Sequence, residues 1–134
     1  MEPVRVTSDR LAAANAIYEE IAFAPSGAAD DLWAIGDLRA LGRIVHHGDG
    51  ALELGGVWVH PDERGRGLAH VLVSHLVRRL EGRACWCLPF VKLDAFYRGY
   101  GFLPTDVPPP DSIVRRLRRC GDLYVEEAVV RLRP

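Results

Sequence analysis

The sequence has few cysteines, no long apolar run and no strong net charge, and each of these shortages excludes a class of protein. Its three cysteines, Cys85, Cys87 and Cys120, are too sparse and odd in number to predict a disulfide framework. No stretch approaches the ~18 uncharged residues that a membrane helix needs. The first residues are not a basic region followed by an apolar stretch, as a secretory signal would be. We therefore expect a cytoplasmic protein without a membrane partner.

The balance of charge also argues against a nucleic-acid partner. The formal net charge is -1, from 17 basic and 18 acidic residues, whereas nucleic-acid-binding domains are usually basic. A length of 134 residues with 49% hydrophobic residues matches one domain of ordinary size, ~100–200 residues. We therefore expect a single domain over residues 1–134.

No metal site is expected. Cys85 and Cys87 lie two apart on a predicted strand without further ligands nearby, so we interpret them as core residues. His70 and His75 are five apart on a predicted helix, which separates them by ~140° around the axis and is too far for one ion.

Hydrophobic spacing predicts three strands in succession after a first helix. The spacing favours a short strand at residues 4–6, a helix over residues 11–21, and strands over residues 32–35, 38–45 and 51–59. Gly55 and Gly56 interrupt the last of these strands, which indicates a bulge or a close backbone approach.

After Pro61 the spacing becomes helical. A buried stripe predicts a helix over residues 68–80, and a short strand over residues 84–88 follows it. A right-handed crossover then places strand 84–88 parallel to strand 51–59. The remaining predicted elements are a brief helix over residues 93–100, a helix over residues 113–119 and a strand over residues 124–132. The prediction is an α/β domain with a mixed sheet.

The segment from residue 57 to residue 69 is the most informative one. Gly65 and Gly67 lie between the end of a buried strand and the first turn of a helix. Glycine lets backbone N–H groups crowd around a ligand, and the unpaired N–H groups and dipole of a helix start attract an anion such as a pyrophosphate. The dinucleotide fingerprint G-x-G-x-x-G and the G-K-[ST] of a P-loop are both absent. A basic surface loop is the alternative.

The same segment resembles motif A of the GNAT acetyltransferase superfamily. Residues 64–69 read Arg-Gly-Arg-Gly-Leu-Ala and fill the R/Q-x-x-G-x-G/A signature, and Val57-x-Val59-x-Pro61 matches its common lead-in. Downstream, residues 96–102 resemble the F-Y-x-x-x-G-F segment of these enzymes, although the asparagine often found upstream of it is missing. Two such motifs about 30 residues apart are much more specific than either alone.

The resemblance implies a fold and an activity. The implied fold is the GNAT fold, a mixed and mostly antiparallel sheet with a parallel pair splayed around the cofactor and helices on its faces. The implied activity is N-acetyl transfer from acetyl-CoA to a primary amine of a small molecule or peptide, directly within a ternary complex. The implied cofactor contacts are the backbone of Val57, Trp58 and Val59 for the pantetheine arm, and Arg64, Gly65, Arg66, Gly67, Leu68 and Ala69 for the pyrophosphate.

Two side chains are candidates for the chemistry. The resemblance makes Tyr97 the acid that protonates the departing thiolate, with a core aromatic as the alternative. Glu53 has the offset from Arg64 at which histone-type relatives carry a base, and partial desolvation would raise its pKa into a useful range. The alternatives are a solvent-facing Glu53 and deprotonation through water. A backbone N–H near Val57 or Trp58 is expected to stabilise the oxyanion.

Other features leave alternatives open. The arginines at 115, 116, 118 and 119 favour a solvated helix face over contact with nucleic acid or CoA phosphates. A non-catalytic acyl-CoA-binding or sensing module needs the glycine loop but neither Tyr97 nor Glu53. No substrate signature identifies the acceptor amine, and a homodimer is also left open.

Overall fold

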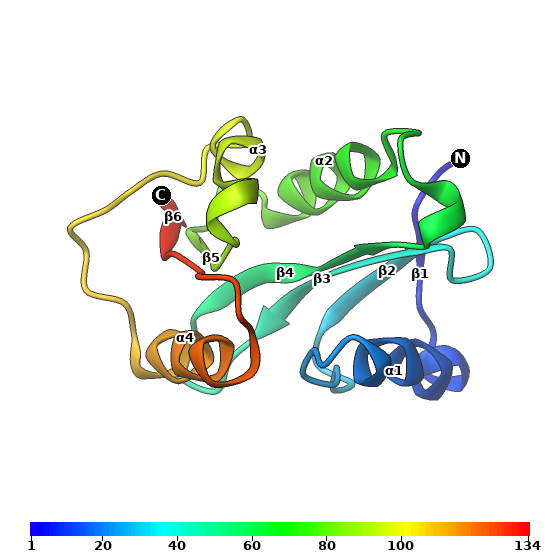
Figure 1. The fold of residues 1–134 in the computed structure, drawn as a ribbon, viewed down its shortest axis with the longest axis horizontal. Coiled ribbons are helices and arrows are strands. Elements are labelled where there is room, and N and C mark those ends of the chain that lie inside the picture. Colours follow the sequence, from blue (N-terminus) through cyan, green and yellow to red (C-terminus); the bar gives the residue numbers. More distant parts are fainter.

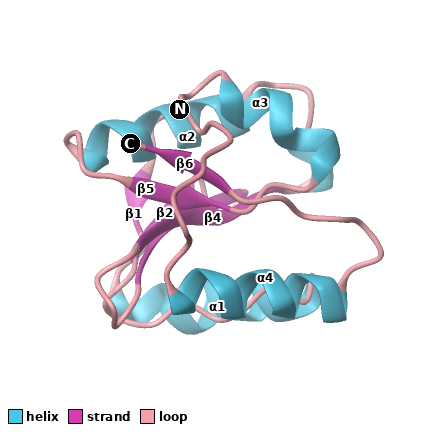
Figure 2. Ribbon diagram, turned by 90° about the vertical axis from the view of Figure 1, so that its left-hand side faces the viewer, coloured by secondary structure: helices cyan, strands magenta, loops and turns pink.

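The computed structural model describes residues 1–134 as one six-stranded sheet with helices on both faces. Helices α2 and α3 cover one face, and α1 and α4 cover the other (Figures 1 and 2). None of the helices is both long and apolar enough to cross a membrane. The elements, in chain order, are β1 (Val4–Arg5), α1 (Leu11–Glu20), β2 (Asp31–Ile35), β3 (Ala40–His46), β4 (Leu52–Val59), α2 (Leu68–Leu80), β5 (Cys85–Cys87), α3 (Asp94–Arg98), α4 (Asp111–Leu123) and β6 (Arg131–Arg133).

The strands follow their sequence order across the sheet, β1-β2-β3-β4-β5-β6. All neighbours are antiparallel except β4 and β5, which are parallel. This parallel pair is joined only at Glu53↔Trp86 and Leu54↔Cys87, so residues 55–59 of β4 have no neighbouring strand on that side. The predicted mixed sheet with a splayed parallel pair is therefore confirmed.

Two strands were predicted to start earlier in the chain than they do. Strand β3 starts at Ala40, because Leu38 has a φ of 53° and belongs to the turn after β2. The last strand was predicted over residues 124–132, but β6 is only Arg131–Arg133. Residues 127–129 instead bond to Pro89 and Val91, and Pro89 has no N–H to continue a regular ladder.

The core lies on both sides of the sheet. Residues of β3, β4, β5, α2 and α3 form the larger cluster, which includes Leu54, Cys85 and Cys87. A second cluster lies under α1 and a third, with Trp86 and Ile113, lies at α4. The two β5 cysteines are buried and unpaired, so the prediction that they are core residues is confirmed.

The predicted irregularity at Gly55 and Gly56 is present as a bulge in β4. The register shifts between Leu41↔Trp58 and Arg43↔Gly55, which leaves an extra residue on β4. Gly56 has a φ of 60°, and its carbonyl accepts a hydrogen bond of 2.8 Å from the Tyr18 hydroxyl. A Cβ at this position would lie 2.8 Å from both the Tyr18 hydroxyl and Arg43 Nε. The close approach therefore requires glycine.

Candidate functional site

The glycine loop opens α2 toward a cavity. Strand β4 ends at Val59, a short turn over Pro61–Glu63 follows, and Gly67 is the N-cap of α2 without a side-chain hydrogen bond. Gly65 and Gly67 have φ values of 81° and 76°, and no atom lies within 4 Å of the Cβ that either lacks. The loop and the first turn of α2 line a cavity, and the unpaired N–H groups of a helix start are the environment that a phosphate group needs.

This first cavity has a volume of about 470 Å³. Its lining includes most of the predicted cofactor residues: Val57, Val59, Arg64, Gly65, Gly67, Leu68 and Ala69. The remaining two point elsewhere. Trp58 packs its ring into the cluster under α1, and the exposed Arg66 donates a hydrogen bond of 3.1 Å to Glu63. Neither of these two residues lines this cavity.

Residues 55–59 of β4 form one wall between the diverging strands. Because β5 does not pair with them, their backbone groups on that side are open to a ligand. An extended chain with amide groups can pair with such a strand edge. The opposite wall contains Phe90, Lys92, Phe96 and Tyr97, of which sequence reasoning identified only Tyr97.

Tyr97 on α3 lies where two cavities meet, because it lines both. Its side chain is buried in the large core cluster, so the alternative of a core aromatic is correct for the ring. Burial raises the pKa of Tyr97 above its ordinary value, with Cys87 as a lesser cause. The phenol therefore stays protonated at neutral pH and can donate a hydrogen bond. Tyr100, by contrast, bonds to His70 and Ser74 and lines neither cavity.

The second cavity has a volume of about 150 Å³ and shares Val57, Phe90, Leu93 and Tyr97 with the first. It runs between β4, the end of β5 and α4. Its apolar lining includes four aromatic residues, and its charged groups are one carboxylate and three guanidinium groups. These groups belong to Glu53, Arg43, Arg116 and Arg119.

Glu53 is buried, so the interpretation of a solvent-facing residue is wrong. Helix α4 covers the face of β4 that strand alternation alone would leave exposed. Oε1 of Glu53 accepts hydrogen bonds from His47 Nε2 at 2.8 Å and from Arg116 Nε at 3.0 Å. Oε2 accepts none within the chain and lies 3.5 Å from the position of a Cβ at Gly55. One oxygen is therefore fixed, and the other is free beside the cavity lining.

The predicted rise in the pKa of Glu53 is also wrong. Burial by itself raises this pKa, but the hydrogen bond from His47 and the charge and hydrogen bond of Arg116 outweigh burial and leave the pKa below its ordinary value. The carboxyl group is therefore ionised at neutral pH. It serves better as an anion that binds an amine than as a strong base.

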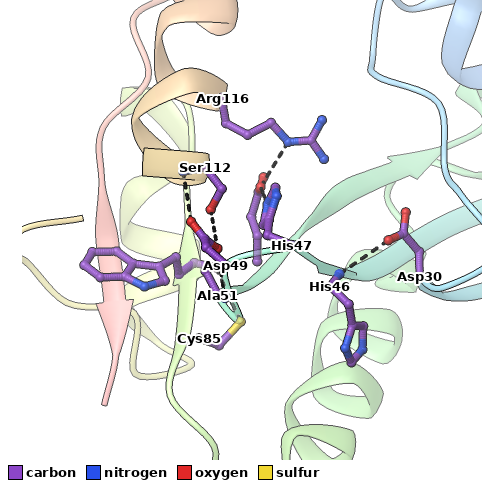
Figure 3. Close-up of polar contacts among 10 residues, drawn as sticks. Asp30, His46, His47, Asp49, Ala51, Cys85, Ser112 and Arg116 are labelled. Carbon is purple, nitrogen blue, oxygen red and sulfur yellow. Dashed lines mark hydrogen bonds and ion pairs between the residues drawn. The ribbon is translucent and has the colours of Figure 1, made fainter. Parts of the chain in front are cut away.

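The turn between β3 and β4 and the start of α4 are held together by side chains (Figure 3). Asp49 accepts hydrogen bonds of 3.1 Å from the Ser112 N–H and 2.9 Å from its hydroxyl. These bonds hold α4 where Arg116 reaches the carboxylate beside His47. Sequence reasoning missed the contact between His47 and Glu53. The two adjacent histidines at 46 and 47 were visible in the sequence, but nothing in their spacing indicated that Glu53 would be the partner.

The arginine run on α4 divides between two surroundings. Arg115 and Arg118 are exposed, as predicted for a solvated face. Arg116 and Arg119 line the second cavity, so for these two the prediction is wrong. Their spacing of three places them on the same side of the helix, and only the packing of α4 on the sheet shows which side faces the cavity.

Comparison with known proteins agrees with this geometry. A family model described as the acetyltransferase (GNAT) family matches residues 8–102. The fold is similar to that of the ribosomal-protein-S18-alanine N-acetyltransferase of Escherichia coli, with a TM-score of 0.67 and 21% identity over 98% of this chain and 92% of that one. It is also similar to Escherichia coli ElaA, with a TM-score of 0.69 and 15% identity over 99% and 97% of the two chains.

A third similar structure is an aminoglycoside 6'-N-acetyltransferase complexed with coenzyme A, with a TM-score of 0.64 and 12% identity over 98% of this chain and 96% of that one. Because the identities are low, these three structures show the fold alone. No curated protein matches the chain.

Proposed function

Because the chain belongs to the acetyltransferase (GNAT) family, we propose that it is an acetyl-CoA-dependent N-acetyltransferase acting on a primary amine by direct transfer in a ternary complex. One observation carries this proposal. Two cavities, one at the open start of α2 and one beside a buried carboxylate, meet at Tyr97 where β4 and β5 diverge. Such a pair of cavities fits a donor and an acceptor that react at their junction.

The donor side is supported by the loop and the strand edge. In the proposal, the N–H groups at Gly67, Leu68 and Ala69 bind the pyrophosphate, and the backbone of residues 57–59 pairs with the pantetheine arm. Arg64 lines the same cavity and adds positive charge. Bound acetyl-CoA supplies an activated acetyl thioester. A backbone N–H near Val57 or Trp58 is in our proposal the group that stabilises the oxyanion.

On the acceptor side, Glu53 Oε2 receives the amine. Because the pKa of Glu53 is lowered, the carboxylate binds the ammonium form by charge and then orients the neutral amine, while the proton leaves through water. This role differs from that of a strong general base with a raised pKa. It uses Oε2, the oxygen of Glu53 that accepts no hydrogen bond within the chain.

Tyr97 acts on the departing thiolate. An ordinary thiol has a pKa of ~8.5, which lies below the raised pKa of Tyr97, so complete proton transfer from the phenol would be uphill. We therefore propose that Tyr97 donates a hydrogen bond to the thiolate as the C–S bond breaks. Such a charge-assisted bond contributes roughly 1.5–3 kcal/mol.

The test is release of free thiol from acetyl-CoA with a panel of primary amines, with mass detection of the acetylated product. We expect Tyr97→Phe to lower kcat by about 10- to 100-fold with little change in the KM for acetyl-CoA. Tyr100→Phe is the matched control, because its hydroxyl bonds to His70 and Ser74 outside both cavities. Full activity of Tyr97→Phe would remove the proposed role.

The main alternative is a non-catalytic acyl-CoA-binding module. It predicts that acetyl-CoA raises the melting temperature of the protein while no amine of the panel releases thiol. It also predicts that Tyr97→Phe and Glu53→Gln leave acetyl-CoA binding unchanged and have no turnover to lose.

A further inference from the structure

The second cavity has an excess of positive charge. Three guanidinium groups line it, and its only carboxylate, Glu53, pairs with Arg116. Neither Arg43 nor Arg119 forms an ion pair with a carboxylate of the chain. Two positive charges thus line a small, largely apolar space without a carboxylate in ion-pair contact with either of them.

Arg43 is the more informative of the two because it is buried. Its residue is only 3% exposed, Nη1 donates a hydrogen bond of 2.7 Å to Ser26 Oγ, and the guanidinium lies 4.3 Å from the ring centre of Tyr18. Its Nε has no hydrogen-bond partner and is enclosed by the protein, and its Nη2 forms no hydrogen bond within the chain. An arginine stays protonated in proteins, and a buried charge is normally paired. Because Arg43 lines the second cavity, we expect a ligand there to supply the missing partner at Nη2.

Arg119 lies on the α4 side of the same cavity and is half-buried. Its only hydrogen bond is a long one of 3.4 Å to the carbonyl of Ala22. Aromatic rings line the same cavity. Tyr124 makes edge contacts with Phe23 and Phe90, with ring centres 6.0 and 5.3 Å apart, and all three rings line the cavity.

We propose that the acceptor is a small primary amine that also carries an anionic group, a carboxylate or a phosphate. Arg43 and Arg119 bind the anionic group, Glu53 Oε2 binds the amine, and the aromatic wall contacts the apolar part between them. The cavity has a volume of only about 150 Å³, which suits a small molecule. This inference rests on the proposed function, because it names the acceptor class for the same site.

The test compares amines that differ only in the anionic group. Phenylalanine is compared with 2-phenylethylamine, and O-phosphoethanolamine with ethanolamine, by kcat/KM from thiol release. We expect the acidic member of at least one pair to be preferred by about 10- to 100-fold, the value of a charge-assisted hydrogen bond. The two pairs distinguish a carboxylate from a phosphate. Equal kcat/KM values within both pairs would overturn the inference while leaving the proposed function intact.

Two variants test which residues bind the anion. Arg119→Gln is expected to reduce the preference ratio by about tenfold or more. Arg118→Gln, on the exposed side of the same helix, is the matched control and should keep the wild-type ratio. Arg43→Gln should reduce the ratio as well, and its circular dichroism spectrum shows whether it has folded. An unchanged ratio in Arg119→Gln and in folded Arg43→Gln would contradict the assignment.

A binding experiment separates the two proposals. Calorimetry measures binding of each amine of the two pairs to the protein in the presence of CoA, without any turnover. If no amine is acetylated but the acidic members bind and Arg119→Gln weakens that binding, the anion site stands and the proposed function fails. If the acidic amines bind no more tightly than their partners without the anionic group, the anion site is refuted whether or not turnover occurs.

Discussion

Replacing Gly56 with alanine tests whether the bulge in β4 is what allows Arg43, which lines the second cavity, to lie against the Tyr18 ring. Gly56 has a φ of 60°, which alanine adopts only with strain. The added Cβ would lie 2.8 Å from Arg43 Nε and 2.8 Å from the Tyr18 hydroxyl. Neither group can move freely, because Arg43 bonds to Ser26 and Tyr18 bonds to the Gly56 carbonyl itself.

Two physical effects determine the size of the loss. The left-handed backbone costs alanine about 1–2 kcal/mol relative to glycine. Overpacking of a tightly filled site costs about 1–3 kcal/mol more. We therefore expect Gly56→Ala to lower the free energy of unfolding by ~2–5 kcal/mol, a large part of the ~5–15 kcal/mol that stabilises a typical domain.

The measurement is urea unfolding followed by tryptophan fluorescence. Gly50→Ala is the matched control, because Gly50 has a φ of 89° and no atom within 4 Å of its missing Cβ. It should lose only the backbone part, about 1–2 kcal/mol. Combining Gly56→Ala with Tyr18→Phe removes one of the two clashing atoms and should recover part of the loss, with Tyr18→Phe alone as the reference. The reasoning is refuted if Gly56→Ala loses no more stability than Gly50→Ala.

Three further predictions concern pH, thiol reactivity and the glycine loop. The lowered pKa of Glu53 contributes stability that is present above the unfolded-state pKa of ~4.3 and is lost as pH falls through the folded-state pKa. In urea unfolding from pH 7 to pH 3, the free energy of unfolding of Glu53→Gln should therefore depend less steeply on pH than that of the wild type. Burial raises the pKa of Cys85 to about 12, so a thiol reagent at pH 8 should modify the half-buried Cys120 first and the β5 cysteines only on unfolding. Gly67→Ala should raise the Kd for CoA roughly tenfold, because it places strain of ~1–2 kcal/mol on the loop proposed to bind the phosphates. Gly82→Ala is the control, because Gly82 has a φ of 79° and open space around it. This variant should strain the other end of α2 and leave the Kd unchanged.

The donor side was largely predictable from the sequence because it is built from a continuous segment. The strand end, the two glycines and the first turn of α2 are neighbours in the chain, and in the proposed function their backbone binds the donor. Residue type and spacing therefore predicted where these residues lie, and their role in binding the donor stays a proposal. Trp58 and Arg66 are the exceptions, because the direction of their side chains depends on packing under α1 and on the contact with Glu63.

The acceptor side was not predictable in the same way. Glu53 was identified as a candidate with a partly desolvated carboxylate, but the sign of its pKa shift was predicted wrongly. Its surroundings come from two other parts of the fold: His47 lies in the turn six positions before it, and Arg116 lies on α4, 63 positions away. In the sequence, nothing distinguishes Arg43 from any other polar residue on a predicted strand. Nothing local indicates that the bulge at Gly56 makes room for it beside the Tyr18 ring.

The sequence by itself thus determined the element order, the mixed sheet and the loop that identifies the family, because these depend on local periodicity and on contiguous backbone. Only the tertiary structure decided that α4 covers the outer face of β4, and this packing buries Glu53 between His47 and Arg116. It also placed Arg43 and Arg119 in the same cavity without an ion-pair partner for either. Charge balance within a cavity is a property of groups brought together from several elements, and for that reason it became visible only in the fold.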